Sequence, residues 1–400
     1  MKITGVEVHN LHYRYPDDEV HRCAEGHMGS RLTTLVFVTT DAGLIGVGSA
    51  YSHPGLLRLI IEGHLASFLI GRDPTHIGEL WDTMYSLTRW YGRKGAAISA
   101  IGAVDIALWD LRGKLEEAPV YELLGGPKQA AVKAYASGLL WQDDLALLVA
   151  EARRHLADGF SLMKMRLGRD ATYDHDAVSA VTRALAGAAR LAVDGTHRYT
   201  EVEAETLGEF LADHDVAWFE EPFPPEDIGA YARLRARTQV PVSAGENEFG
   251  VQGFRELFQA GAVAIAQPDA ARAGGITECL RIGKLAQDYG VRVVTHTWSD
   301  AVALTANAHV VAALENGDAV EVDRTGCPFM TDLLHVAPEI ENGMLRLGDQ
   351  PGLGIAVDLD VMGKLELPAG EQLPAGNYAD LVFGGEPYTP VPPHASPPSA

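Results

Sequence analysis

Ionisable side chains recur between residues 164 and 321 every 23 to 30 residues, each at or near the end of a short apolar run. A single acid in such a place is usually a helix cap or a loop residue. A regular series is different, because the strands of a parallel barrel all end at one mouth, where buried charges must pair or bind an ion. The spacing therefore predicts one polar site. Its members are Lys164, Asp194, Glu220, Glu246, Asp269, His296 and Glu321.

Three acids on successive runs offer oxygen ligands only, namely Asp194, Glu220 and Glu246. Oxygen ligands suit a hard octahedral ion such as Mg²⁺, and the lack of Cys or His at these positions disfavours Zn²⁺. Neighbouring residues of a strand point to opposite faces, so Glu220 and Glu221 cannot both face the ion, and Glu221 is the less suitable of the two. We therefore expect a Mg²⁺ site.

The other members of the series could carry out acid–base chemistry. Lys164 and Arg166 lie two residues apart and so share one face of a strand. They could simply pair with the acids, but a lysine opposite a metal is also placed to stabilise developing negative charge. Asp269 and His296 lie on adjacent strands. A lone histidine is usually a core residue, yet a neighbouring aspartate that fixes its tautomer makes it a general-base candidate near neutral pH.

Residues 132 to about 325 alternate between short apolar runs and helix-like segments. This alternation is typical of βα units around a parallel sheet, and the span is close to the roughly 200 to 250 residues of a TIM-like barrel. An open doubly wound sheet is the competing topology, but no GxGxxG motif follows the first run. The expected strands are Val132–Ser137, Ser161–Leu167, Leu191–Asp194, Ala217–Glu220, Pro241–Gly245, Ala264–Pro268, Arg292–Thr297 and Ala319–Val322.

The preceding residues predict an antiparallel meander followed by helices, which is an α+β unit. The expected strands are Ile3–Tyr13, Leu32–Thr40 and Leu44–Tyr51, and the expected helices cover about 55–70, 74–91 and 94–115. We assign residues 1–127 to this unit, 128–349 to the barrel, and about 350–386 to a segment that packs back on the first unit. The proline-rich residues 387–400 are expected to be a disordered tail.

Residues 16–30 are polar and lack a regular period, so we expect a mobile loop that closes over the barrel mouth. Together with this loop, the segment around Tyr51 and His53 is expected to contact the substrate and set specificity.

Composition limits the class of partner. A net charge of −22 argues against nucleic acids and anionic membranes, and no apolar run reaches the ~18 residues that span a bilayer. The first residues resemble a strand and no secretory signal, so we expect a cytoplasmic protein. Cys23, Cys279 and Cys327 show no CxxC spacing, which argues against a disulfide framework or a zinc site and favours three buried thiols.

The residues above stand in segments that resemble the mandelate racemase subgroup of the enolase superfamily, over about residues 1 to 360. The stretch 103–114 is similar to a signature helix of that family, and three further motifs are similar to its strand ends. These are Glu220-Glu221-Pro222, Ala244-Gly245-Glu246-Asn247 and Gln267-Pro268-Asp269. The resemblance implies an N-terminal capping domain over a (β/α)₇β barrel.

The resemblance also implies roles for the polar residues. It implies Mg²⁺ bound by Asp194, Glu220 and Glu246, and thus selects Glu220 over Glu221. A dyad of His296 and Asp269 is implied as the catalytic pair. Lys164 is implied to face the substrate carboxylate, and Glu321 to hydrogen-bond the substrate carboxylate or enolate.

Two positions depart from the family pattern. Where the family often has Lys-x-Lys, this chain has Lys164-Met165-Arg166, and an arginine is a poor proton acceptor because it stays protonated. Where the family often has Asp-x-Asn, this chain has Asp194-Gly195-Thr196-His197, so His197 could be an additional acid or only a loop residue. A racemase needs a base on each face of the carbon, and the arginine removes the second base.

We therefore expect a Mg²⁺-dependent dehydratase of an aldonic or aldaric acid, which removes the proton next to the carboxylate and eliminates the 3-hydroxyl to give a 2-keto-3-deoxy acid. His296, once protonated, could be the acid that helps the 3-hydroxyl leave if elimination is syn. A racemase, epimerase or cycloisomerase is the alternative, and a non-catalytic sugar-acid binding protein is a further one. Expected substrate contacts are Arg166, His197, Tyr51 and His53. Family members are often symmetric, so a homo-oligomer is expected.

Overall fold

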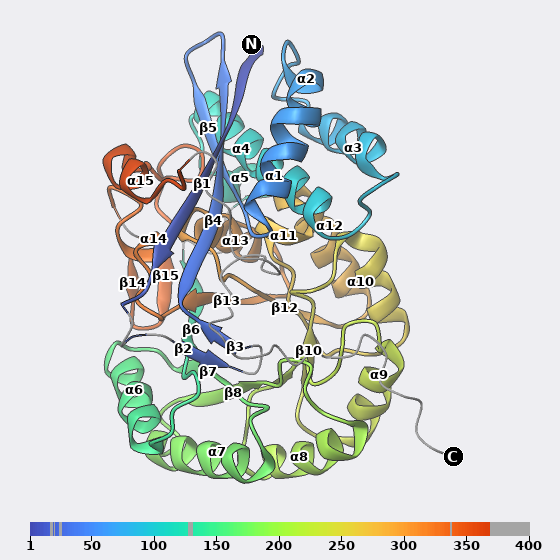
Figure 1. The fold of residues 1–400 in the computed structure, drawn as a ribbon. Coiled ribbons are helices and arrows are strands. Elements are labelled where there is room, and N and C mark those ends of the chain that lie inside the picture. Colours follow the sequence, from blue (N-terminus) through green and yellow to red (C-terminus); the bar gives the residue numbers. More distant parts are fainter. Residues whose placement is uncertain (17–18, 20, 24–25, 127–130, 337, 369–400) are drawn as a thin grey trace.

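The computed structural model describes residues 1–368 except 17–18, 20, 24–25, 127–130 and 337. Its centre is a parallel barrel of eight strands in chain order, closed by pairing of the last strand with the first (Figure 1). The predicted barrel is confirmed. The strands are β6 (Ala131–Gly138), β7 (Leu162–Arg166), β8 (Arg190–Asp194), β9 (Phe219–Glu220), β10 (Val242–Ala244), β11 (Ile265–Ala266), β12 (Arg292–Thr295) and β13 (Gly317–Asp323).

A helix follows each of the first seven strands, as a (β/α)₇β barrel requires, and these helices form the outer ring in Figure 1. The connection after β11 contains two helices. The helices are α6 (Leu145–Ala157), α7 (Ala171–Leu185), α8 (Glu201–Asp213), α9 (Ile228–Arg237), α10 (Gly250–Gln259), α11 (Ala270–Ala273), α12 (Gly275–Asp288) and α13 (Ala301–Ala313). The short α14 (Pro328–Thr331) and the strands β14 (Ile340–Glu341) and β15 (Met344–Arg346) come next, and β15 pairs antiparallel with β6.

An apolar layer fills the barrel directly below its polar mouth. Successive strand residues alternate between two faces, so a residue two positions further along the same strand lies on the same face, one step nearer the mouth. The residues of this buried cluster stand two positions before the ionisable series. They include Leu162, Ala192, Trp218, Val294 and Ala319, packed with Tyr135 and Ile265. Strand alternation therefore places the polar side chains at the mouth.

The N-terminal unit is an antiparallel sheet covered by helices. Its strands are β1 (Ile3–Arg14), β4 (Ser30–Thr40) and β5 (Ile45–Ala50), in the order β1-β4-β5. Its helices are α1 (Pro54–Ile60), the π-helical turn η1 (Ile61–Leu65), α2 (Ala66–Leu69), α3 (Ile77–Thr88), α4 (Ala96–Glu116) and α5 (Val120–Leu123). The three helical segments that the sequence predicted are present, the first as the run α1-η1-α2.

Helix α4 is wedged between β5 and the barrel helices α11 and α12, which explains why it is buried on nearly all sides. The close approach to β5 depends on two glycines. A Cβ atom on Gly46 would lie 2.0 Å from the Ala107 carbonyl oxygen, and one on Gly48 would lie 1.9 Å from the Ala103 carbonyl oxygen. A side chain at either position would therefore push β5 away from α4 within the capping unit.

Residues 16–30 contain more structure than the sequence indicated. The short strands β2 (His21–Cys23) and β3 (Gly26–Met28) pair antiparallel, and the Trp141 amide donates to the Arg22 carbonyl at 2.9 Å. The sequence did not predict this hairpin, because a two-stranded ladder needs no buried face and so shows no alternation of apolar and polar residues. Cys279 and Cys327 are buried as expected, but Cys23 is only half buried, since the hairpin places it at the barrel mouth.

The chain after the barrel returns to the capping sheet. Helix α15 (Leu359–Leu365) lies beside β1, and the Leu367 amide donates to the Asn10 carbonyl at 2.7 Å. Residues 369–400, with the predicted tail, lie outside the described residues. In the described ranges, no helix combines the length and apolar character needed to cross a membrane.

His309 joins the barrel to the capping unit and gives a prediction for stability against pH. It is buried in α13, accepts from the Tyr121 amide at 3.1 Å through Nδ1 and donates to the Leu353 carbonyl at 3.2 Å through Nε2. Burial lowers the pKa of this imidazole to about 4. Between pH 6.5 and 4 the unfolded chain therefore binds the proton and the folded chain does not, so acidification destabilises the fold through this residue.

Lowering the pH from 7 to 5 is expected to reduce the free energy of unfolding through His309 by roughly 2 kcal/mol. Urea unfolding at both pH values measures this. His309→Asn should show a pH dependence weaker by that amount, and an identical dependence in both proteins would contradict the assignment.

Candidate active site

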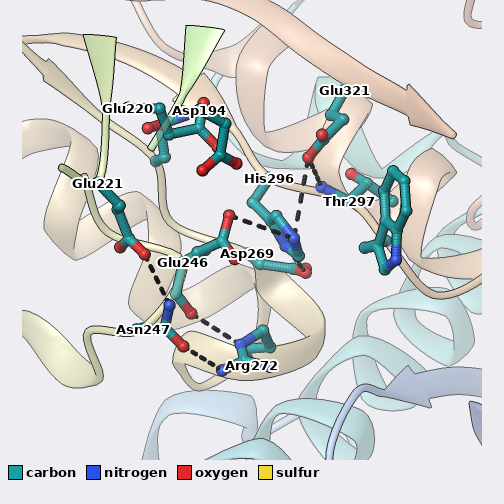
Figure 2. A network of polar contacts seen from close by, with 12 residues as sticks. Asp194, Glu220, Glu221, Glu246, Asn247, Asp269, Arg272, His296, Thr297 and Glu321 are labelled. Carbon is teal, nitrogen blue, oxygen red and sulfur yellow. Dashed lines mark hydrogen bonds and ion pairs between the residues drawn. The ribbon is translucent and has the colours of Figure 1, made fainter. Parts of the chain in front are cut away.

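Three carboxyl groups lie together at the barrel mouth (Figure 2). Asp194 ends β8, Glu220 ends β9, and Glu246 follows β10. One ligand oxygen from each lies within 4.8 Å of the others. Asp194 and Glu220 are buried, whereas Glu246 is partly exposed. The three side chains thus offer a ring of oxygen ligands to one small cation.

Hydrogen bonds satisfy part of this carboxylate ring and leave one of its oxygens without a donor. Trp218 Nε1 and Gln267 Nε2 donate to Glu220 Oε2 at 2.9 and 2.6 Å, which orients that carboxylate from below and beside it. Glu246 Oε2 is buried and has no hydrogen-bond partner among the described residues. A buried anionic oxygen without a donor is unfavourable, and a hard divalent cation would satisfy it. The donor set therefore fits Mg²⁺.

Two cations of β7 compensate the carboxylates. Lys164 forms ion pairs with Glu220, with Glu321 at 2.8 Å and with Asp194 at 3.5 Å, while Arg166 pairs with Asp194. Burial alone would lower the pKa of the Lys164 ammonium, but Glu220 and Glu321 outweigh burial and raise it. Burial raises the pKa of Glu220 well above its usual range, against the effect of Lys164. Both cations stay charged at any working pH.

His296 follows β12 and faces the carboxylate ring. Its Nδ1 lies 2.8 Å from Asp269 Oδ2, so the carboxylate accepts from Nδ1–H and leaves Nε2 to act on a substrate. The Nε2 atom lies 3.6 Å from Glu246 Oε2 and 3.9 Å from Glu321 Oε2. The geometry is that of a general base oriented by an aspartate, directly beside the candidate metal site.

The carboxylates around His296 control its charge. Burial alone would lower the pKa of the imidazole, but the charges of Glu246 and Glu321 and the hydrogen bond to Asp269 raise it to about 9. Glu321 is ionised in turn, because Lys164 and His296 outweigh burial and lower its pKa to about 2. An ionised Glu321 accepts hydrogen bonds, including one from the Thr297 amide at 2.9 Å, and cannot donate one to an enolate in this state.

Glu221 lies outside the carboxylate ring, as the resemblance implied. Its φ of 33° turns the chain at the end of β9 and directs the side chain to His197 Nε2 and to Asn247 Nδ2 at 2.7 Å. Thr196 and His197 also have positive φ, 46° and 60°, which is uncommon for side chains of this kind. Such strain is characteristic of functional positions, and it places the His197 ring at the mouth.

A cavity opens onto these groups from the side of the capping unit. Two arginines, residues of the β2–β3 hairpin and residues that follow the barrel strands contribute to its wall. The lining residues are Cys23, Met28, Tyr51, Leu140, Arg166, Asp194, Thr196, His197, Glu221, Glu246, Asn247, Arg272, His296 and Trp298. Of the predicted substrate contacts, Arg166, His197 and Tyr51 line it. His53 does not line it, because its Nδ1 instead caps α1 by accepting from the Leu56 amide at 3.4 Å.

Sequence reasoning did not identify several residues that hold the site. Asn307 donates through Nδ2 to Asp269 Oδ1 at 2.9 Å, to the His296 carbonyl at 2.9 Å and to Thr297 Oγ1 at 3.0 Å. No local pattern distinguished Asn307, because Thr305 and His309 are also polar residues of this largely apolar helix. Arg272 donates to the Glu246 carbonyl at 2.7 Å, and no local pattern indicated it.

Comparisons with known proteins agree with this geometry. Residues 147–361 match the family model described as enolase C-terminal domain-like, and residues 7–125 match that of the mandelate racemase / muconate lactonizing enzyme N-terminal domain. The chain is 34% identical to the D-galactarolactone cycloisomerase of Agrobacterium fabrum, over 92% of this chain and 100% of that protein. It is 33% identical to the arabinonate dehydratase of Saccharolobus solfataricus, over 89% and 96%.

Solved structures give the same picture. The 3,6-anhydro-D-galactonate cycloisomerase from Zobellia galactanivorans superposes with a TM-score of 0.85 at 36% identity, covering 92% of this chain and 100% of that one. A racemase from Streptomyces coelicolor A3(2), with bound magnesium, superposes with a TM-score of 0.85 at 27% identity, covering 91% and 100%.

Asn307 supports the His296–Asp269 pair, and its replacement should be costly. Asn307→Leu keeps a similar volume but leaves the buried Asp269 Oδ1, the Ala270 amide and the His296 carbonyl without this partner, so we expect a loss of roughly 3 kcal/mol or more in unfolding free energy. Thr305→Val on the same helix is the control and should cost less than about 1 kcal/mol, because it removes only a bond to the helix backbone. Equal losses in the two variants would contradict this role for Asn307.

Proposed function

Since this chain belongs to the mandelate racemase / muconate lactonizing enzyme family of the enolase superfamily, we propose that it is a Mg²⁺-dependent dehydratase of an aldonic or aldaric acid. The observation that carries the proposal is the ring of Asp194, Glu220 and Glu246 beside the His296–Asp269 pair. The arabinonate dehydratase relative supports a sugar acid as substrate.

Asp194, Glu220 and Glu246 would hold the cation. When bound, Mg²⁺ acidifies the proton next to the substrate carboxylate and stabilises the resulting enediolate. The magnesium present in the Streptomyces coelicolor racemase structure supports this choice of metal. The orphaned Glu246 Oε2 is the feature of this chain that calls for it.

His296 removes the proton through Nε2. The imidazole must be neutral to do so, and a Glu246 carboxylate shared with a cation holds the imidazolium less strongly than the free carboxylate does. Asp269 keeps Nδ1 protonated and the ring oriented toward the cavity. Lys164 provides a permanent positive charge that stabilises the developing enediolate. Glu321 forms an ion pair with the Lys164 ammonium group and holds it in place.

The elimination then breaks the bond between C3 and its hydroxyl oxygen. A proton joins that oxygen, water leaves, and the enol becomes a 2-keto-3-deoxy acid. Two groups on the cavity wall can supply the proton, the imidazolium of His296 and the His197 ring held by Glu221. Arg166 pairs with Asp194 and stays protonated, so it cannot take a proton from the opposite face of the carbon.

A cycloisomerase is the second candidate, because two of the most similar proteins bear that name. The chemistry differs only in the leaving group. In a 3,6-anhydro acid the oxygen on C3 belongs to a ring, so the same proton abstraction and C3–O cleavage would open the ring without releasing water. The site therefore accommodates both reactions, and the substrate decides between them.

Turnover tests the proposal. With Mg²⁺ and a panel of aldonic, aldaric and anhydro sugar acids, the wild-type protein should form a keto acid, and His296→Asn should lower kcat by roughly 10²- to 10⁴-fold while ligand affinity is retained. Mass spectrometry separates a product that has lost water from an isomer. Ligand binding without any turnover by the wild-type protein would contradict the proposal.

Deuterium exchange tests whether a base acts on only one face of the substrate C2 carbon. In D₂O the remaining substrate should acquire deuterium at C2 without inversion of configuration, because His296 exchanges the proton on one face of that carbon and the permanently protonated Arg166 cannot do so on the other. Formation of the C2 epimer would show a second base and favour a racemase or epimerase, with Lys164 as the first residue to substitute.

Magnesium binding has a sharp control in the neighbouring glutamates. Mg²⁺ should raise the melting temperature of the wild-type protein and of Glu221→Gln, but barely that of Glu246→Gln. The raised pKa values of Glu220 and His296 mean that Mg²⁺ displaces protons, so affinity should increase from pH 6 to pH 8. A larger loss of Mg²⁺ affinity in Glu221→Gln than in Glu246→Gln, measured by calorimetry, would reverse the ligand assignment.

A further inference from the structure

The segment that carries His296 is held from two sides. We name residues 296–300, between β12 and α13, the base loop; all of its residues are buried. Asn307 of α13 fixes it from the barrel side. The strands β4 and β5 of the capping unit fix it from the other side, through Arg31, Thr33 and Ser49.

Arg31 of β4 is the centre of the capping contacts. Its guanidinium is fully buried, donates to the Trp298 carbonyl, pairs with Asp323 and donates to Thr325 Oγ1 at 3.1 Å. Its Cζ atom also lies 4.8 Å from the centroid of the Trp298 ring. Burying a guanidinium costs several kcal/mol unless it is paired, so the position of this group is set tightly by its partners.

Arg31 thereby joins the two strand ends that carry His296 and Glu321. Trp298 lies two residues after His296, and Asp323 lies two residues after Glu321, on the same face of β13. A side chain from the capping sheet thus bridges the elements whose reactive atoms are 3.9 Å apart.

The same loop makes further contacts with the capping sheet and with β7. Thr33 Oγ1 and Ser49 Oγ, the latter at 2.6 Å, donate to Asp300 Oδ2, and Asp300 Oδ1 caps α13 by accepting from the Val302 and Ala303 amides at 2.9 Å. Arg166 also stacks on Trp298, with its Cζ 5.2 Å from the ring centroid. The loop is therefore the point at which capping sheet and active site meet.

We infer that Arg31 is a positioning residue: the capping unit, beyond covering the cavity, holds the base loop and so sets where His296 meets the substrate. This inference rests on the proposed function, because it concerns the base of that reaction. Displacing a catalytic group by about 1 Å can cost roughly 10²-fold in rate. Loosening the loop should therefore act on the proton-transfer step while leaving substrate binding largely intact.

Arg31→Lys is the primary test, because it keeps the charge for Asp323 but cannot also reach the Trp298 carbonyl with a second nitrogen. We expect kcat to fall roughly 10- to 100-fold with little change in KM. The primary isotope effect on kcat with C2-deuterated substrate should rise, since proton transfer becomes rate-limiting. Hydrogen exchange of the amides in residues 297–304 should accelerate, a readout that needs no substrate.

Two further variants make the test decisive. Thr33→Val replaces the hydroxyl group that bonds Asp300 with a methyl group. It should change kcat, the isotope effect and the loop exchange in the same direction but less, and it replaces Arg31→Lys as the test if that variant does not fold. Asp110→Asn is the matched control: its buried carboxylate accepts from the Val47 and Leu353 amides at 2.9 Å, away from the base loop. It should lower the melting temperature without changing kcat or the isotope effect.

Unchanged kcat and unchanged hydrogen exchange of the base loop in both Arg31→Lys and Thr33→Val would overturn the inference. It would also be overturned if Asp110→Asn lowered kcat and raised the isotope effect as much as Arg31→Lys does. If the wild-type protein turns over no sugar acid, the proposed function fails, and the exchange experiment then decides separately whether the capping unit holds the loop.

Discussion

Carboxylates held side by side in a buried place repel one another, and this repulsion governs the barrel mouth. At about 4 Å, two such charges oppose each other by on the order of 4 kcal/mol at an effective dielectric constant near 20. Asp194, Glu220 and Glu246 are nevertheless gathered within 4.8 Å. Lys164 and Arg166 offset part of the repulsion, yet burial still raises the pKa of Glu220. In addition, Glu246 Oε2 has no hydrogen-bond donor among the described residues. The remaining imbalance is what a divalent cation would remove.

The fold makes this crowding possible because it fixes each carboxylate by independent means. Strand alternation places Asp194 and Glu220 directly above the apolar layer of the barrel, with Trp218 and Gln267 donating to Glu220 from within the barrel. The capping sheet closes the other side and, through Arg31, ties the ends of β12 and β13 together. Charge, barrel geometry and domain packing therefore meet at His296.

Much of this arrangement could be predicted from the sequence, because both signals involved are periodic. The recurrence of short apolar runs predicted the strands of the barrel, and the ionisable residues at or near the ends of those runs, 23 to 30 residues apart, predicted the polar mouth. Contacts between distant segments were less accessible. Asn307 contacts the site from 11 residues beyond His296 in the chain, and Arg31 contacts it from the capping unit. No local sequence pattern marks either residue. The positive φ of Glu221 and the β2–β3 hairpin likewise depend on neighbours in space.

The central claim is that three carboxylates share one divalent cation beside His296. Crystals grown with Mn²⁺, with anomalous scattering collected at the manganese edge, test it most directly. The account predicts a single strong peak coordinated by Asp194, Glu220 and Glu246, with His296 Nε2 facing the ligand positions that they leave open. A peak elsewhere in the molecule, or manganese coordinated by Glu221 in place of Glu246, would contradict it.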